Sequence, residues 1–458
     1  MATNPMANGG NFLSKITNGK KKKNNDITTT GIIIANLVGM NNSVEIVSEA
    51  CSCCWDKPLP NTYNELAEYI ARRGKTGHTS IIEHSNYVIL LEIDMNYEDS
   101  LVSFLDNVHY LYTKTIFNFE NRKIYLLIGG SYRGFSDIYR ETDDMSNPVL
   151  QAITGNIYTY APSCMFEDII NLGILNKISF LDSEPDENFC LIGKRNAYEC
   201  DKFRIVSYDD MDKLYKNIAS VSKYVAERIT KYDLCKFTTV TILFKNMSRV
   251  ITQQLCRHRN AITQESQRYV DYSKACFNDP CMFKPGRYDP DHKYTVQFGS
   301  SSNMFMTLKQ IGESIVKLYG MLHNPVITGK EYALMQEDAR AFLPGNTQCR
   351  KIYMTFTYKS LIKFLHLRED KAAQAEIRMY ATEIGDWFRN NTLFTNKEIC
   401  DMYTNPRLLI KDENPITIDE VSEVDVNEEI TEDDYIKAMG IMEEINNPTA
   451  KLEKDDEV

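Results

Sequence analysis

The stretch QLCRHRNAITQESQRY, residues 254–269, places three arginines, a histidine and several amide and hydroxyl side chains close together. Apolar residues recur upstream at helical spacing, so we expect a helix from Met247 through Arg259 and a loop after it. An arginine guanidinium pairs with phosphate oxygens through two parallel hydrogen bonds, and the interleaved polar residues could complete an anion site. A solvated basic helix end is the alternative interpretation.

A second polar segment, GHTSIIEH at residues 77–84, precedes an expected buried strand from Tyr87 to Ile93. Its two histidines, hydroxyls and carboxylate can bind a polar ligand. They can equally form a helix cap around a core histidine, and the sequence leaves both interpretations open. The spacing differs from the His and Glu arrangements of zinc proteases, so no metal site is predicted.

Two downstream segments also carry charge. EDARAFLP, residues 337–344, places a charged triplet before an apolar run, and taken alone it is more typical of a surface ion pair. A long helix is expected from Ser360 to about Phe388, and Arg368 falls within its apolar stripe. A buried arginine is costly unless it is paired or binds an anion. A structural ion pair and a ligand contact therefore both remain open for Arg368.

Composition restricts the class of protein. The chain has 458 residues, of which 43% are hydrophobic and 25% charged, as in an average globular protein. Its strongly apolar stretches are too short to span a membrane, and the N-terminus lacks a signal-peptide core. The 12 cysteines then indicate reduced thiols, with Cys51, Cys53 and Cys54 packed in an early helix. We expect a soluble, cytoplasmic protein without membrane partners.

Charge is distributed unevenly. Residues 411–458 contain seventeen acids and four bases, while the whole chain has a net charge of −11, so residues 1–410 carry +2. A nearly neutral body does not indicate nucleic-acid binding, which needs a dense basic face. The Lys20–Lys23 run is more typical of a solvated tail than of a nuclear signal or nucleic-acid patch. No repeat period is visible in the sequence.

Taken together, the four polar segments resemble the flavin-dependent thymidylate synthase family. The family's motifs follow one another here in the family's order, which makes a chance match improbable. The matches are Gly-His-x-Ser-x-x-Glu-His at residues 77–84, Arg-His-Arg at 257–259, Ser-x-Arg-Tyr at 266–269, Glu-Asp-Ala-Arg-x-x-Leu-Pro at 337–344, Phe-Leu-x-Leu-Arg at 364–368 and Ala-Gln-x-Glu-Ile-Arg at 373–378.

The resemblance covers about residues 31–95 and 237–390 and implies an α+β fold, in which a central, mostly antiparallel sheet packs with long helices. We read the roughly 140 residues between these stretches as an inserted domain. The expected organisation is a disordered basic arm (1–30), a first catalytic-domain segment (31–95), the inserted domain (96–236), a second catalytic-domain segment (237–405) and a flexible acidic tail (406–458).

The resemblance also implies an activity. The family makes dTMP from dUMP, with methylenetetrahydrofolate as carbon donor, NADPH as hydride source and FAD as mediator, and it uses no cysteine nucleophile. It further implies a homotetramer with sites at subunit junctions. Arg368 would be the catalytic residue, favouring the N3-ionised form of the uracil, because a nearby cation lowers the pKa of an acidic N–H.

The remaining roles are carried over motif by motif from the resemblance. The residues that would bind FAD are His78, Ser80, Arg257, His258, Arg259, Thr357, Lys359 and Lys363. The residues that would bind dUMP are Gln254, Arg257, Gln264, Glu265, Ser266, Arg268, Arg340 and Arg368.

Three departures from the family pattern stand out. The spacer between Arg259 and Ser266 has six residues where the family usually has seven, and Thr357 and Lys363 replace asparagines that usually meet the flavin. The large insertion is the third. An inactive descendant that binds nucleotide or flavin is therefore an alternative, and a cysteine mechanism at Cys281, which follows Pro280, is another.

Overall fold

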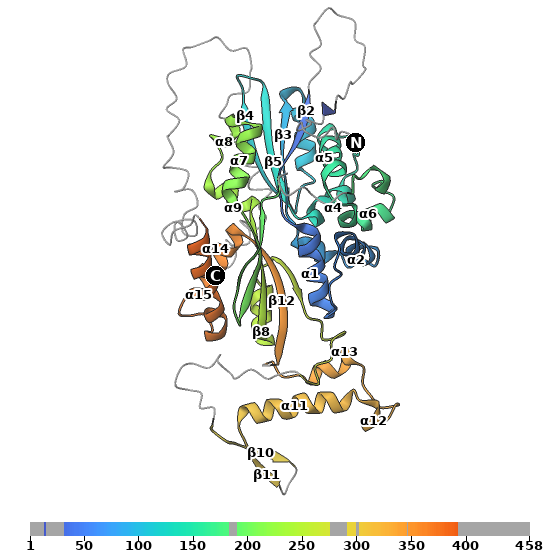
Figure 1. Cartoon of the computed structure of the whole chain (residues 1–458), viewed down its shortest axis with the longest axis vertical. Coiled ribbons are helices and arrows are strands. Elements are labelled where there is room, and N and C mark those ends of the chain that lie inside the picture. Colours follow the sequence, from blue (N-terminus) through green and yellow to red (C-terminus); the bar gives the residue numbers. More distant parts are fainter. Residues whose placement is uncertain are drawn as a thin grey trace, which may run out of the picture.

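The computed structural model describes Leu13–Ser14 and residues 32–182, 190–274, 291–298, 302–345 and 347–392. Within these residues the chain forms two five-stranded antiparallel sheets and a separate two-stranded hairpin. The first sheet lies in the upper half of Figure 1 and the second in the lower half, with helices on their faces. The α+β class with antiparallel sheets and many helices is therefore confirmed.

The first sheet has the strand order β1-β2-β3-β5-β4. Its core strand β3 is buried along almost its whole length, as a strand covered on both faces should be. The strands are β1 (Leu13–Ser14), β2 (Ile33–Met40), β3 (Tyr87–Asp94), β4 (Tyr112–Asn118) and β5 (Lys123–Gly130). The helices are α1 (Ser43–Trp55), α2 (Tyr63–Lys75), the 3₁₀ helix η1 (Thr79–His84), α3 (Glu98–Leu105), α4 (Tyr132–Glu141), α5 (Pro148–Tyr160) and α6 (Glu167–Asn171).

The second sheet has the strand order β6-β7-β8-β12-β9. Its strands are β6 (Gly193–Glu199), β7 (Phe203–Asp209), β8 (Thr239–Ser248), β9 (Ala261–Gln264) and β12 (Gln348–Thr357). Its helices are α7 (Met211–Val221), α8 (Lys223–Ala226), α9 (Lys231–Phe237), α10 (Arg249–Cys256), α14 (Tyr358–Glu369) and α15 (Ala375–Asn391).

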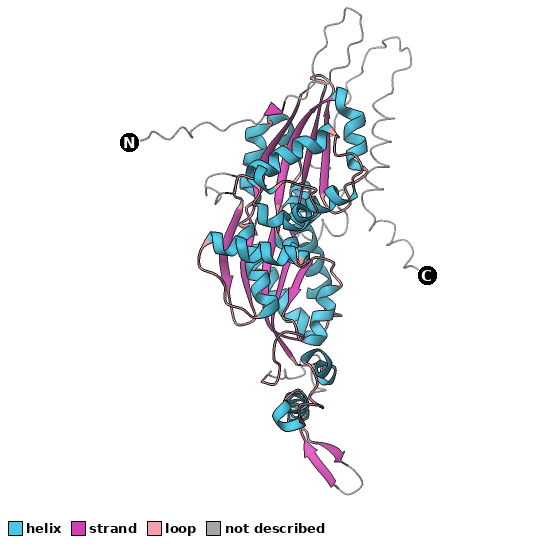
Figure 2. Ribbon diagram, turned by 90° about the vertical axis from the view of Figure 1, so that its right-hand side faces the viewer, coloured by secondary structure: helices cyan, strands magenta, loops and turns pink. Residues whose placement is uncertain are grey.

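The connection between β9 and β12 projects from the end of the second sheet (Figure 2). It contains the hairpin β10 (Tyr294–Phe298) and β11 (Ser302–Met306), and the helices α11 (Leu308–Leu322), α12 (Pro325–Thr328) and α13 (Gln336–Ala339). It returns to the sheet through the 3₁₀ helix η5 (Arg340–Phe342), so the predicted EDARAFLP motif lies at the base of this projection.

Two predicted helices differ from the structure. The helix expected from Met247 begins only at Arg249, because Met247 and Ser248 still pair with Cys349 and Gln348 of β12. The long helix expected from Ser360 to Phe388 is divided into α14 and α15. The carboxylate of Asp370 accepts a hydrogen bond from the backbone N–H of Ala372 at 2.7 Å, a local turn that competes with helix continuation.

The strand pairing crosses both predicted limits of the 96–236 segment. Its first two strands, β4 and β5, belong to the first sheet through the pairing of β5 with β3. Its last two, β6 and β7, belong to the second sheet through the pairing of β7 with β8. The limits at 96 and 236 therefore coincide with no sheet boundary in the described residues, and the idea of an insertion stays a prediction.

Several predictions fall outside the described residues. These are the Pro280-Cys281 site, the acidic tail and the basic arm, except that Leu13–Ser14 of the arm pair with Ile33 and Ile34 of β2. Among the helices of the described ranges, none is long and apolar enough to cross a membrane.

Candidate functional site

The end of α10 and the end of α14 bring four predicted residues together. Arg368 Nε donates a hydrogen bond to His258 Nε2 at 3.0 Å, and the His258 ring packs edge-on against Phe364. Burial, followed by the neighbouring Arg368, Lys363 and Arg257, lowers the pKa of His258 to about 4. The ring is therefore neutral at pH 7, and because its Nε2 accepts, its proton lies on Nδ1.

We call Arg257, His258, Lys363 and Arg368 the arginine cluster. Desolvation and the repulsion from Arg257 lower the pKa of Arg368. Arg257 and Arg259 are exposed, and within the described residues no side-chain hydrogen bond or ion pair engages either guanidinium. Arg259 also has a left-handed backbone, with a φ of 49°. The cluster is suited to an anionic ligand.

Two further predicted flavin contacts, Thr357 and Lys359, lie at the start of α14. Thr357 is the N-cap, and its hydroxyl accepts a hydrogen bond from the backbone N–H of Ser360 at 3.1 Å. Lys359 Nζ lies 5.5 Å from the centre of the Tyr232 ring.

A second group forms where the Ser266 loop meets the EDARAFLP motif. Arg268 Nε donates to Glu337 Oε2 at 2.9 Å, and Arg340 Nε donates to the carbonyl of the same residue at 3.0 Å. Both arginines are exposed. The Ser266 hydroxyl accepts from the backbone N–H of Arg268 at 3.2 Å, which fixes the loop at the predicted Ser-x-Arg motif. We call Ser266, Arg268, Glu337 and Arg340 the Ser266 group.

Aromatic side chains of α1 and the η1 segment border the Ser266 group. Trp55 stacks on Tyr269 with ring centres 6.2 Å apart, and His78 meets the edge of Trp55 at 5.2 Å. Arg73 lies over Trp55, with its guanidinium carbon 4.3 Å from the ring centre. His78 is exposed, and so is Ser80 two residues further on. The His78 segment and the Ser-x-Arg-Tyr motif therefore come from distant regions of the chain to one place.

His84, in contrast, is a core residue. Its two ring nitrogens form hydrogen bonds of 2.9 Å with Thr263 of β9 and Thr355 of β12. Complete burial lowers its pKa to about 3, so the ring stays neutral. Two interpretations were left open for residues 77–84, a ligand site and a cap around a core histidine. His84 is the core histidine, whereas His78 is exposed and available to a ligand.

The remaining predicted residues have protein partners. The side-chain amide of Gln254 donates to Gln374, and Gln264 accepts from Arg249. Glu265 is buried and accepts two hydrogen bonds from Arg350, at 2.9 and 2.7 Å.

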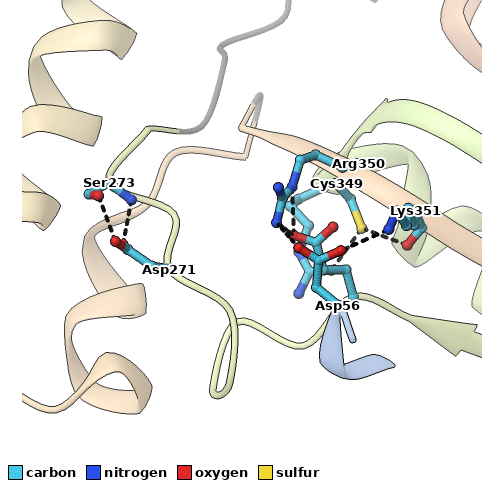
Figure 3. A network of polar contacts seen from close by, with 8 residues as sticks. Asp56, Asp271, Ser273, Cys349, Arg350 and Lys351 are labelled. Atoms are coloured by element: carbon cyan, nitrogen blue, oxygen red, sulfur yellow. Dashed lines mark hydrogen bonds and ion pairs between the residues drawn. The ribbon is translucent and has the colours of Figure 1, made fainter. Parts of the chain in front are cut away.

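Figure 3 shows Asp56, at the end of α1, facing Arg350 and Lys351 of β12. Asp271 and Ser273, also drawn there, bond to each other on the chain segment beyond the Ser266 loop. Sequence reasoning missed Asp56, Arg350, Trp55 and Arg73, because no local motif marks residues that meet only through folding.

Cysteine and metal chemistry have no visible basis in the described ranges. No group of three or more His, Cys, Asp or Glu side chains there could hold a metal ion. Cys51 and Cys53 are buried in α1, and burial raises the pKa of the Cys51 thiol to about 12. A thiol with so high a pKa is a poor nucleophile at neutral pH.

Residues 193–391 match the family described as thymidylate synthase complementing protein, Thy1. We call these matched residues the Thy1 segment. The Thy1 segment includes the whole second sheet, the arginine cluster and the Ser266 group, and it leaves the first sheet outside. It also includes residues 193–236, which the sequence had placed in the inserted domain.

Two similar proteins are named flavin-dependent thymidylate synthases. The protein of Pyrococcus furiosus is 28% identical over 192 residues, which cover 42% of this chain and 68% of the relative. The protein of Kosmotoga olearia is 29% identical over 143 residues, covering 31% of this chain and 58% of the relative.

Solved structures show weaker likenesses. A UMP/dUMP methylase from Streptomyces cacaoi bound with 5-Br UMP is 17% identical, with a TM-score of 0.30, covering 44% of this chain and 92% of that chain. A Helicobacter pylori thymidylate synthase X with FAD and dUMP is 14% identical, with a TM-score of 0.27, covering 39% and 89%.

Proposed function

We propose that this chain is a flavin-dependent thymidylate synthase that methylates dUMP reductively to dTMP. Methylenetetrahydrofolate would donate the carbon, NADPH the hydride, and FAD would mediate. The observation that carries the proposal is that the Thy1 segment contains the Arg257-His258-Arg259 and Ser266-to-Tyr269 motifs, each beside further cationic groups that the family pattern expects. The names of the relatives support the same activity.

FAD fits the arginine cluster by charge. Its two linked phosphates are anionic, and the exposed Arg257 and Arg259 guanidiniums have no acidic partner among the described residues. We assign the phosphates to these arginines with Lys359 and Lys363, and place His78 and Ser80 near the flavin. When bound, FAD would supply the redox chemistry, while the protein supplies orientation and electrostatics.

The departures from the family pattern are compatible with this assignment. Thr357 replaces an asparagine, and both residue types are favoured helix N-caps. Because the Thr357 hydroxyl caps α14, the start of that helix is preserved. Lys363 replaces a second asparagine, and lysine can meet a phosphate as a point charge. The activity is therefore favoured over an inactive, ligand-binding descendant.

We assign dUMP to the Ser266 group. Arg268 donates to the Glu337 carboxylate and Arg340 to the Glu337 backbone carbonyl, so a nucleotide phosphate could take the place of that carboxylate at Arg268, close to Arg340. The amides of Gln254 and Gln264 would contact the nucleotide. Glu265 would act through the loop, because its Oε1 is already bonded to Arg350.

Arg368 is assigned to the uracil ring. A cation beside N3–H favours the ionised base, and the charge that enters the ring raises the nucleophilicity of C5. His258 holds the guanidinium through its neutral Nε2, so it would position Arg368 without adding another charge. No protein nucleophile is then required.

The described contacts do not join Arg368 to the Ser266 group within one chain. We propose that a second chain completes the site at a subunit junction, in keeping with the homotetramer that the resemblance implies. We further propose a cytoplasmic location, where dUMP, NADPH and reduced folate would be met.

Release of the C5 hydrogen from labelled dUMP tests the function directly. With FAD, NADPH and methylenetetrahydrofolate present, we expect release that depends on both FAD and NADPH and persists in the Cys281→Ala variant. Release without either cofactor, lost in Cys281→Ala, would instead establish the cysteine mechanism. dUMP binding without any release would favour the inactive descendant.

A further inference from the structure

The fold is repeated within the chain, although the sequence shows no repeat. We call residues 33–160 the first unit and residues 203–391 the second unit. Leaving out the edge strands β1 and β6, the sheet order is β2-β3-β5-β4 in the first unit and β7-β8-β12-β9 in the second. In each unit the chain visits these four positions in the same order, with helices between the first two strands and two helices after the last.

Details of register repeat as well. β2 pairs with β3 through an irregularity between Leu37 and Gly39, and β7 pairs with β8 through one between Ile205 and Ser207. When Met40 is aligned with Tyr208, these irregularities fall at the same position. The last strand of each unit also leads into a helix capped by a hydroxyl, from Ser131 for α4 and from Thr357 for α14. Such agreement is unexpected for unrelated sheets.

The two units exchange their first helices. α1 of the first unit packs on the second sheet, where Ile46, Ala50 and Cys53 contact Val206 and Tyr353. α7 of the second unit packs against the first sheet, and Asn217 donates to the carbonyl of Val38 at 2.8 Å. Figure 1 shows α1 (blue) beside β12 and α7 (green) beside the upper sheet. The exchange creates two equivalent junctions between the units.

The first junction is polar. It joins the η1 segment of the first unit to β9 and β12 of the second, where His84 bonds to Thr263 and Thr355. Thr355 in turn bonds to Thr241 of β8, with 2.8 Å between their hydroxyl oxygens. The exposed His78 and the Ser266 group border this junction.

The second junction has the same geometry with different chemistry. Phe237 ends the segment before β8, as His84 ends the segment before β3. It lies against Gly129, where an added Cβ would be 3.1 Å from Phe237 Cδ1. Gly129 corresponds to Thr355 of the second unit. Gly129 pairs with Tyr112, the first residue of β4, and Thr355 pairs with Ala261, the first residue of β9. A polar histidine–threonine contact is thus replaced by an apolar one.

The arginine cluster also has an altered counterpart. The residues that precede β4 by the same number of positions as Arg257-His258-Arg259 precede β9 are Val108-His109-Tyr110. His109 Nε2 lies 4.0 Å from the carboxylate of Glu141 near the end of α4. His258 instead meets Arg368 near the end of α14. The neighbour of His109 is therefore an acid, whereas the neighbour of His258 is an arginine, and anion binding is disfavoured beside His109.

We propose that each chain binds dUMP and FAD at the first junction only, where its first unit supplies residues 77–84 and its second unit supplies residues 257–268, and that the second chain proposed above completes this one site. The opposite segments, 230–237 and 108–119, do not carry the Gly-His-x-Ser-x-x-Glu-His and Arg-His-Arg motifs. Such complementary loss is expected if one site draws on both units, whereas a site within one unit would preserve both motifs in the same unit. The proposal rests on the function proposed above.

Stoichiometry tests the proposal on the full-length protein. We expect one dUMP per chain by equilibrium dialysis and one FAD per chain by flavin absorbance. Two of either ligand per chain would overturn the single site while leaving the proposed function intact. Failure to bind dUMP and FAD would refute both.

A matched pair of histidine variants locates the site. We expect His258→Ala to weaken FAD binding at least tenfold and His109→Ala to change it less than twofold. Equal weakening by both variants would contradict the assignment. Because His258 is half-buried, Arg257→Ala repeats the test at an exposed position, and an unchanged affinity there would also count against the proposed junction.

Discussion

The neutral His258 ring and the Arg368 guanidinium form the contact on which catalysis should depend most sharply. We expect Arg368→Lys to keep most of the dUMP affinity but to lower kcat at least a hundredfold, because a lysine ammonium cannot keep the Nε–H bond to His258 while facing the base. Separate measurement of dUMP affinity and single-turnover rate checks this. Lys363→Arg is the control within the same cluster. Full turnover in Arg368→Lys would remove Arg368 from the chemistry.

Arg268 offers a test of the Ser266 group. Its removal should weaken dUMP binding by about 2 kcal/mol, roughly the value of a hydrogen bond to a charged group. Calorimetric titration with dUMP measures the loss, and Arg228→Ala, an exposed arginine on the helix-α8 side, provides a matched control. Equal affinities for Arg268→Ala and the unmodified protein would place the phosphate elsewhere.

Asp209 links protonation to the stability of the contact between units. Its Oδ2 accepts from Asn86 of the first unit and from the N–H and hydroxyl of Thr239. Burial raises its pKa to about 6, so between about pH 4 and 6 the folded state holds a proton that the unfolded state has lost. This contribution therefore falls as pH rises through that window, by at most about 3 kcal/mol.

The variant Asp209→Asn tests whether the contribution of Asp209 to stability falls as pH rises. The free energy of unfolding of the unmodified protein, relative to that of the variant, should decrease from pH 4 to pH 6 in urea titrations. Asn41 occupies the corresponding place in the first unit and also accepts through its Oδ1, so an asparagine is structurally compatible. Parallel curves for the two proteins would show that Asp209 does not titrate in this range.

At the scale of elements, the N-caps of α4 and α14 provide a comparison between the units. Thr357→Ala should cost about 1 kcal/mol of unfolding free energy, and Thr357→Asn should restore most of it, because asparagine is also a favoured cap. Ser131→Ala should cost a similar amount without affecting FAD binding. Chemical denaturation and flavin titration of the three variants check both effects. A fully stable Thr357→Ala would refute the capping role.

Elements whose apolar pattern is strong and local could be predicted from the sequence. These include β3, which lies at its expected position, and α1, the early helix that contains Cys51, Cys53 and Cys54. Met247 was assigned to a helix because its apolar spacing fits one, yet pairing with β12 keeps it in a strand. The break after Glu369 depends on a side-chain hydrogen bond of Asp370, which periodicity does not reveal.

The candidate site shows the same limit. Arg257, His258 and Arg368 were proposed from their motifs, and the structure places them together, although their roles stay untested. The repeated fold could not be predicted, because equivalent positions carry unlike residues such as His84 and Phe237. Packing and register preserve the repeat, while residue identity does not.

At the scale of the whole molecule, the number of units bears on assembly. The homotetramer implied by the resemblance contains four copies of one fold, and two chains of this protein already supply four units. We therefore expect the mass of two chains by light scattering coupled to size exclusion. A mass of four chains would favour the literal homotetramer, and a single chain would contradict a site completed between chains.

The exchanged helices have a consequence for where this protein can be cut. The Thy1 segment, residues 193–391, matches a family by sequence, yet Val206 and Tyr353 of its sheet are covered by α1, which lies outside it. Expressed alone, this segment would present that bare apolar face to solvent and invite aggregation. The smallest fragment that can fold alone is therefore larger than the Thy1 segment. A fragment cut at the limits of the family match would lack the helix that covers its sheet.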